Sequence, residues 1–162
     1  MERLWTPWRR AFVEHAASLG TSECFLCAYA TGTDDAANLV LLRADSVYVV
    51  LNLYPYNSGH LMIAPHAHTG DLAKLDASVA MEMMRVTQHS VDVLQHAYRP
   101  DGFNIGLNLG KAAGAGVPDH LHTHVVPRWN GDTNFMPITA ETKVLPESLA
   151  QTYARLKPYF AP

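Results

Sequence analysis

Three short hydrophobic runs lie in the first half of the chain, with polar turn residues between them. They cover residues 39–44, 47–53 and 60–65, and their β-branched and aromatic content favours strands. Only Asp45 and Ser46 separate the first two runs, and segment 54–59, which contains Pro and Gly, separates the second from the third. Connections this short predict an antiparallel meander.

The hydrophobic spacing then changes to the helical period. Between Asp76 and Tyr98 the sequence contains no Gly or Pro. Apolar side chains recur there at steps of three or four residues or their multiples, at Val79, Met83, Val86, Leu94 and Ala97. This pattern predicts one long amphipathic helix, and the following "RPDG" predicts its end.

Two more strands and a second helix complete the pattern. We expect strands over 103–110 and 120–128, and a C-terminal helix over 146–160 with Pro146 at its start. This order of elements is typical of an α+β fold. We expect a single domain over 1–162, divided into an irregular N-terminal extension (about 1–37), a core (38–130) and a C-terminal extension (131–162).

Composition narrows the class of protein. The 162 residues are 48% hydrophobic and 17% charged, which indicates a globular chain. The formal net charge of -3 predicts no binding to nucleic acid or to an anionic membrane surface. No apolar stretch approaches the roughly 20 residues that span a bilayer, and "MERLWTPWRR" lacks the apolar region of a signal peptide. We therefore expect a cytoplasmic protein.

The segment "DHLHTHVVPRW" carries the candidate chemistry. His120, His122 and His124 alternate, so in a strand their side chains share one face. The three alternating histidines have three interpretations: scattered histidines that are simply hydrogen-bonded, a metal site, or nucleophilic catalysis by neutral imidazole. The preceding "NLGKAAGAG" offers backbone N–H groups to phosphate oxygens. Together with the histidines, this loop favours phosphoryl or nucleotidyl transfer.

Cys24 and Cys27 form a C-x-x-C pair at the spacing of many tetrahedral zinc sites. Two further ligands would be needed. The alternatives are two small buried thiols and a redox pair, and no thioredoxin-like βαβ pattern supports the latter.

The motif "HLHTHVV" resembles the H-x-H-x-H-x-x signature of the histidine triad superfamily, with Thr123 as a mild departure. The segments "LNLYPYNSGHLMIAP", "GFNIGLNLG" and "AGAGVPDHLHTHVVPRW" extend the resemblance over roughly 38–130. "LWTPWR" and "RWNGDTNFMP" resemble bacterial members of the branch that holds fragile histidine triad proteins and diadenosine tetraphosphate phosphorylases and hydrolases. The family pattern has no residue that corresponds to Asp119, so this position resembles an insertion of one residue.

The resemblance implies that His122 attacks the α-phosphorus of a nucleotide and forms a nucleotidyl-histidine, which water or phosphate then releases. The backbone carbonyl of His120 would accept the Nδ1 proton of His122, and His124 would contact the phosphate or the leaving oxygen. Further substrate contacts are implied for Asn52 at the ribose, Asn108 at the phosphates, the loop residues Gly114, Ala115 and Gly116, and His60. Leu51, Leu53 and Pro55 are candidates for a nucleobase slot, or ordinary core and turn residues.

The resemblance also implies a structural zinc ion held by Cys24, Cys27, His68 and His120, with His66 as an alternative to His68. It implies a homodimer formed through the long helix and the fourth-strand region. No organic cofactor is expected, and a divalent cation such as Mg²⁺ would accompany the polyphosphate.

The predicted function is cleavage of dinucleoside polyphosphates such as diadenosine tetraphosphate or triphosphate. A nucleoside phosphoramidase and a nucleotide-binding regulatory module remain open alternatives. A protein that uses the three histidines only to bind metal is disfavoured, because it would not need a phosphate-binding loop.

Overall fold

A computed structural model describes residues 24–132 and 146–160. Its centre is a five-stranded sheet in which all neighbouring strands are antiparallel. In spatial order the strands are β1 (Val40–Arg43), β2 (Val47–Leu51), β3 (Leu61–Pro65), β5 (Thr123–Arg128) and β4 (Gly102–Leu107). The first three form the predicted meander, and the last strand in sequence then inserts between β3 and β4.

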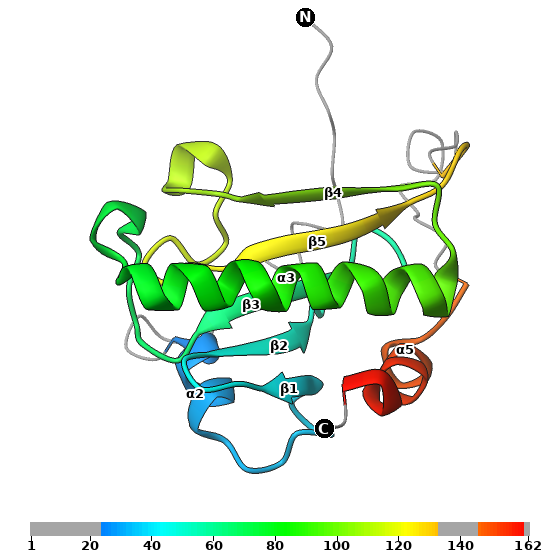
Figure 1. Cartoon of the computed structure of the whole chain (residues 1–162), viewed down its shortest axis with the longest axis horizontal. Coiled ribbons are helices and arrows are strands. Elements are labelled where there is room, and N and C mark those ends of the chain that lie inside the picture. Colours follow the sequence, from blue (N-terminus) through cyan, green and yellow to red (C-terminus); the bar gives the residue numbers. More distant parts are fainter. Residues whose placement is uncertain (1–23, 133–145, 161–162) are drawn as a thin grey trace, which may run out of the picture.

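Helices lie on both faces of this sheet. The long helix α3 (Ala77–Tyr98) runs across the face seen in Figure 1, and α5 (Leu149–Leu156) lies near one of its ends. The short helix α2 (Phe25–Thr31) packs on the opposite face. Single 3₁₀ turns cover Leu72–Lys74, Lys111–Ala113 and Lys157–Phe160. None of the helices in the described part of the chain is both long and apolar enough to cross a membrane.

Alternation along the strands divides the core into two layers. In β2, Val47, Val49 and Leu51 belong to the cluster that includes α3, whereas Tyr48 and Val50 belong to the cluster beneath α2. In β5, Val125 packs into the α3 cluster. Its neighbour His124 therefore points to the face opposite α3.

Two polar side chains of the sheet, Tyr48 and Arg43, form hydrogen bonds to helix α2. The buried hydroxyl of Tyr48 donates to the carbonyl of Leu26 at 2.8 Å. The Arg43 guanidinium donates to the carbonyls of Tyr29, Ala30 and Gly32 at the other end of the helix. The bonds from Arg43 satisfy carbonyls that the C-terminal end of a helix leaves without intrahelical partners. Together with the Tyr48 bond they fix the position of the helix that follows Cys24 and contains Cys27.

The fold class and the long helix predicted from sequence are confirmed. Asp76 is the N-cap of α3, and its side chain accepts from the Ser78 amide. The five apolar residues used to predict this helix are all buried or pack against the core.

The four largest differences from the prediction concern β5, β4, the C-terminal helix and α2, and the other strand boundaries differ by one or two residues. β5 begins at Thr123, so His120 and His122 precede the strand, and β4 ends at Leu107. The C-terminal helix begins after Ser148, not at Pro146, because Ser148 and Gln151 form a reciprocal capping box. The segment predicted to be irregular contains α2, whose seven residues are too few to show a hydrophobic period. The segment "LWTPWR" and residues 133–137 of "RWNGDTNFMP" lie outside the described residues.

The turn before β3 depends on Gly59. Its φ is +79°, and a Cβ there would lie 3.0 Å from Leu94 Cδ2 and 3.1 Å from a ring carbon of Tyr98. Gly59 therefore lets the turn pack directly against α3 while it adopts a backbone conformation that other residues avoid.

We predict that Gly59→Ala destabilises the protein by about 2–4 kcal/mol, since a positive φ and overpacking both oppose the methyl group. Urea denaturation measures the change. Gly102→Ala is the matched control, because a Cβ at Gly102 meets nothing within 4 Å, and it should shift stability by less than about 0.5 kcal/mol. Equal effects of both substitutions would contradict this explanation.

Candidate active site

His122 lies just before β5 in a conformation that suits a nucleophile. Its Nδ1 is 2.8 Å from the backbone carbonyl of His120, and a carbonyl can only accept, so Nδ1 carries the proton. The lone pair of the neutral ring is therefore on Nε2. Burial lowers the pKa of His122 below its ordinary value. The ring is thus neutral near pH 7, with Nε2 as its nucleophilic atom.

A second hydrogen-bonded chain sets the tautomer of His124. The amide of Tyr56 donates to His60 Nδ1 at 3.1 Å, so the proton of the neutral His60 ring is on Nε2. His60 Nε2 lies 3.0 Å from His124 Nδ1 and donates to it. The neutral His124 ring then carries its proton on Nε2 and offers a donor there. His60 is 1% exposed, so we interpret it as orienting His124 rather than as touching substrate directly.

The His122 and His124 rings lie edge to face with their centroids 4.9 Å apart. One ring presents a lone pair and its neighbour presents an N–H donor. An imidazole nucleophile beside a donor for an oxygen atom is the pair of groups that in-line attack on a phosphorus atom needs. The sequence predicted this pairing, although not the part played by His60.

A cavity of about 590 Å³ extends from His124 along the sheet. β5 and β4 form its floor, because Gly106 pairs with His124 and Asn104 pairs with Val126. Its polar lining comes from Tyr56, Asn57, Asn104, Asn108, His124 and Arg128. The predicted phosphate residue Asn108 therefore lies in the same cavity as His124.

The glycine-containing loop departs from the prediction in one respect. The amide of Gly114 donates to the Lys111 carbonyl at 3.0 Å, and that of Ala115 donates to the Gly110 carbonyl at 3.3 Å. Both amides are therefore occupied by the turn itself and are not directed to a phosphate. Within the described residues, the amide of Gly116 has no such bond, so it is the one backbone donor of this set left for a substrate.

Asn52 follows β2 directly. Its side-chain oxygen accepts from the Tyr54 amide at 2.9 Å, and its nitrogen lies 3.4 Å from His60 Nε2. Asn52 is half-buried, and its side-chain oxygen already accepts the hydrogen bond of the turn. The ribose contact implied by the resemblance stays a prediction.

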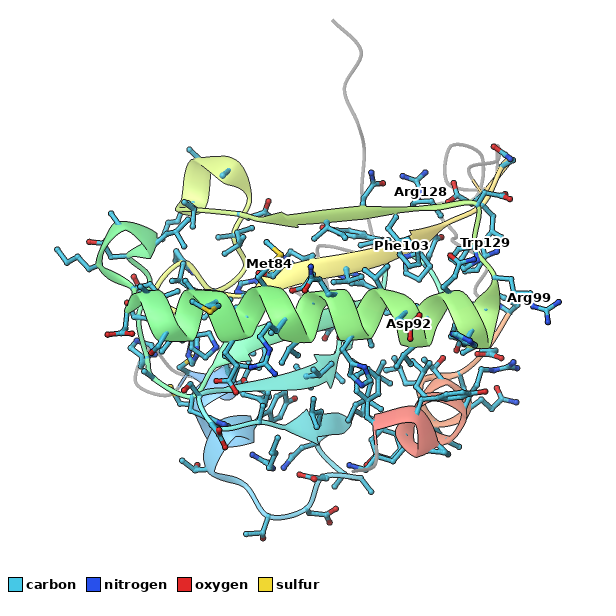
Figure 2. The ribbon with its side chains drawn as sticks, viewed as in Figure 1. Met84, Asp92, Arg99, Phe103, Arg128 and Trp129 are labelled. Carbon is cyan, nitrogen blue, oxygen red and sulfur yellow. The ribbon has the colours of Figure 1, made fainter. Side chains whose placement is uncertain are left out.

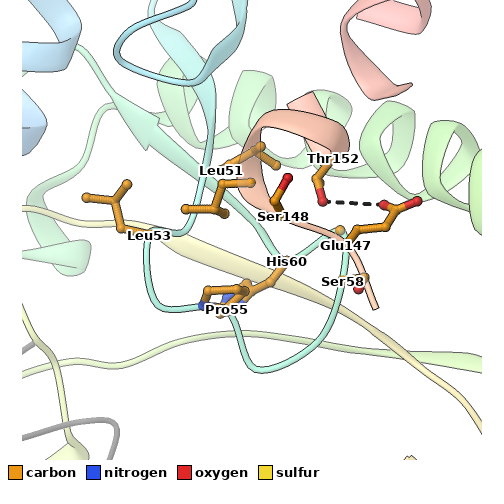
Figure 3. Close-up of a pocket in the computed structure, with 10 residues that line it drawn as sticks. Leu51, Leu53, Pro55, Ser58, His60, Glu147, Ser148 and Thr152 are labelled. Atoms are coloured by element: carbon orange, nitrogen blue, oxygen red, sulfur yellow. Dashed lines mark hydrogen bonds between the residues drawn. The ribbon is translucent and has the colours of Figure 1, made fainter. Parts of the chain in front are cut away.

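The residues suggested for a nucleobase slot line a second, smaller hollow of about 260 Å³ (Figure 3). Leu51, Leu53 and Pro55 form one side of it, and Glu147 and Ser148 before α5 form another. Leu51 also belongs to the α3 core cluster, so this hollow lies on the α3 side of the sheet. His60 borders it, but His122 does not.

Four side chains from three distant segments meet beside the triad. Cys24, Cys27, His68 and His120 each direct one ligand atom to a common point, and all four atoms lie within 4.8 Å of one another. Three of their four S···N pairs are in close contact: Cys24 Sγ lies 3.3 Å from His120 Nδ1, and Cys27 Sγ lies 3.2 Å from His68 Nδ1 and 3.5 Å from His120 Nδ1. A tetrahedral zinc ion with ordinary bond lengths requires S···N edges of about 3.5 Å, so the donor set fits zinc.

His120 is prepared for a metal by its other ring nitrogen. Its Nε2 donates to the Pro65 carbonyl at 2.8 Å, which leaves the Nδ1 lone pair directed to the thiols. Burial lowers the pKa of His120, which keeps this nitrogen unprotonated. Burial, followed by the neighbouring Cys24 thiol, raises the pKa of the Cys27 thiol. A bound cation must therefore displace a thiol proton. His66, the alternative ligand, instead approaches the Ala44 carbonyl at 3.0 Å.

Sequence reasoning missed a polar network at the far end of the cavity. The Asp132 carboxylate accepts from Arg128, from Asn57 and from the amide of Trp129. The hydrogen bond from Arg128 contributes most to holding the pKa of Asp132 far below its usual range. Strand parity could have identified Arg128, because positions 124, 126 and 128 share one face of β5.

Comparison with known proteins gives concordant likenesses. A family model described as the HIT domain matches residues 34–131. A protein of Mycobacterium tuberculosis named AP-4-A phosphorylase is 42% identical over 159 residues, which cover 94% of this chain and 80% of that protein. A bis(5'-adenosyl)-triphosphatase of Saccharomyces cerevisiae is 31% identical over 91 residues, which cover 56% of this chain and 44% of that protein.

Among solved structures, a Zn-bound histidine triad family protein from Mycobacterium smegmatis superposes with a TM-score of 0.69 at 27% identity. The match covers 87% of this chain and 95% of that one. The likeness therefore extends over nearly the whole fold.

Proposed function

The chain belongs to the HIT domain family, and we propose that it is a phosphorylase of diadenosine tetraphosphate. The resemblance predicted from the triad is thereby confirmed. Its likeness to AP-4-A phosphorylase and to bis(5'-adenosyl)-triphosphatase supports an enzyme that cleaves dinucleoside polyphosphates. Phosphate as the acceptor is the finer part of the proposal, and the similarity to a phosphorylase over 94% of the chain supports it.

The observation that carries the proposal is the 2.8 Å bond from His122 Nδ1 to the His120 carbonyl. It leaves the lone pair of the neutral ring on Nε2, the atom that attacks the substrate in the proposed mechanism. In the first step a bond forms between Nε2 and the α-phosphorus, and the bond from that phosphorus to the bridging oxygen breaks, so that ATP leaves. His124 donates a hydrogen bond from Nε2 to the oxygen on which charge develops.

In the second step an oxygen of inorganic phosphate attacks the same phosphorus atom. The P–N bond to His122 breaks, ADP is released and the neutral imidazole returns. Between the two steps the adenylylated ring is cationic, and the His120 carbonyl stabilises it by accepting a charge-assisted hydrogen bond from Nδ1–H. In this proposal Asn108, which lines the same cavity as His124, and the amide of Gly116 bind phosphate oxygens.

We predict that diadenosine tetraphosphate yields ATP plus ADP only when inorganic phosphate is present, as separated by anion-exchange chromatography. His122→Ala should lower kcat by at least about 10⁴-fold, since the covalent route is lost. Its binding of AMP should persist. ATP plus AMP formed in phosphate-free buffer would make the protein a hydrolase, and substantial turnover by His122→Ala would remove His122 as the nucleophile.

We also propose that the four-residue cluster holds a structural zinc ion. The fit of the donor atoms supports this, and the similar protein from M. smegmatis is described as Zn-bound. Cys24, Cys27, His68 and His120 would bind the ion, which would tie α2 to the segment that carries the triad. The homodimer, the cytoplasmic location and an accompanying Mg²⁺ stay predictions from the sequence.

We predict about one equivalent of zinc in the purified protein, measured by plasma mass spectrometry. Cys24→Ser should lower the zinc content and the melting temperature together, because metal binding contributes to folding. His66→Ala is the matched control at a neighbouring histidine outside the cluster, and it should keep its zinc. A wild-type protein that is stable and free of metal would refute the proposal.

A further inference from the structure

The cavity that begins at His124 ends at a fixed cation. Arg128 is four residues beyond His124 on the same face of β5, and both side chains line the cavity. At about 3.3 Å per residue the two positions are about 13 Å apart along the strand. Figure 2 shows Arg128 near the end of the β4–β5 strand pair. Because Val125 packs toward α3, positions 124, 126 and 128 lie on the face away from that helix.

The guanidinium of Arg128 is held in place by hydrogen bonds to Asp132 and Asn104. Its Nε and Nη2 donate to the two oxygens of Asp132 at 2.6 Å and 2.8 Å, and its Nη1 donates to the Asn104 side-chain oxygen at 2.5 Å. These bonds use three of its five N–H groups. Within the described residues, the other two have no assigned acceptor, so they are left for a ligand.

The pair presents its positive member to the cavity. The Arg128 side chain is 40% exposed, whereas that of Asp132 is 9% exposed. Asp132 Oδ2 also accepts from Asn57 at 2.7 Å and from the Trp129 amide at 3.2 Å. The carboxylate is thus largely buried and bonded to Arg128 through both oxygens, and it acts as the support for Arg128. A planar guanidinium group that is held in one orientation is well suited to donate hydrogen bonds to phosphate oxygens.

We propose that Arg128, oriented by Asp132 and Asn104, binds the distal phosphates of the departing nucleotide and so selects substrates by the length of the polyphosphate chain. This inference rests on the proposed function, because it concerns the leaving half of the same substrate. A chain of several phosphates that starts at His124 can extend along the cavity toward Arg128. A nucleotide without this chain reaches His122 and His124 but not the distal cation.

The purely structural alternative is that Arg128 only ties the edge strand β4 to the turn at 129–132. The two explanations predict different kinetics. Loss of a tie would weaken every property of the site, including AMP binding and thermal stability. Loss of a phosphate contact would raise KM for the long substrate and leave AMP binding unchanged.

The test uses the whole protein with the substitution Arg128→Gln, and Arg85→Gln as the matched control. Arg85 is exposed on α3, across the sheet from the cavity, and its substitution removes the same charge. For Arg128→Gln we expect KM for diadenosine tetraphosphate to rise about 10- to 100-fold, the effect of losing a charge-assisted hydrogen bond. We expect kcat and the calorimetric Kd for AMP to change less than about threefold. Arg85→Gln should match the wild type.

Arg128→Lys is the second variant, since it keeps a cation and a partner for Asp132 but loses the planar fork. Its KM should lie between those of the wild type and Arg128→Gln, at an unchanged melting temperature. An unchanged KM in Arg128→Gln would overturn the inference, and so would a parallel decrease in AMP affinity and melting temperature in both variants. Either result would leave the proposed function standing. A wild type that cleaves no dinucleoside polyphosphate would overturn the proposed function and this inference with it.

Discussion

The hydrogen bond between His122 Nδ1 and the His120 carbonyl is the interaction on which the rest of the site depends. It fixes the tautomer of the proposed nucleophile, and in the proposed mechanism the carbonyl stabilises the positive charge of the adenylylated ring. The residue that supplies this carbonyl also directs its own side chain into the Cys24, Cys27 and His68 cluster. One residue thus joins two sites. A metal ion that holds the His120 ring would also hold the carbonyl that orients His122, and the anchoring of α2 by Tyr48 and Arg43 contributes to the same end.

The sheet topology determines where the cavity beside His124 lies. β5 inserts between β3 and β4, so His124 has a paired strand on each side, at Met62 and at Gly106. β3 leads back to His60, which orients His124, and β4 supplies Asn104 beside Arg128. Alternation along β5 then sends Val125 to the α3 core and leaves positions 124, 126 and 128 on the opposite face. The buried hydrophobic layer therefore fixes the face on which His124 and Arg128 lie.

Much of this could be predicted from sequence, for identifiable reasons. The long helix has five apolar residues in register, and the triad has a distinctive spacing, so both were found. The start of β5 at Thr123 was missed because the H-x-H-x-H pattern alternates whether or not its first residues pair in a ladder. The hydrogen bonds from His60 to His124 and from Arg128 to Asp132 join turn residues to strand residues. The hydrophobic periodicity of a single segment does not predict such contacts. His68 was found only through family resemblance, since nothing local distinguishes it from His66.

The most direct test of the account is to isolate the covalent intermediate. Wild-type protein is mixed with diadenosine tetraphosphate in phosphate-free buffer, quenched within milliseconds, and digested for peptide mass spectrometry. The account predicts one adenylyl group on the peptide that contains His122, at the ring nitrogen Nε2, and its loss on addition of inorganic phosphate with formation of ADP. Substrate consumption without an adenylylated peptide, or an adenylyl group on His124 instead, would contradict it.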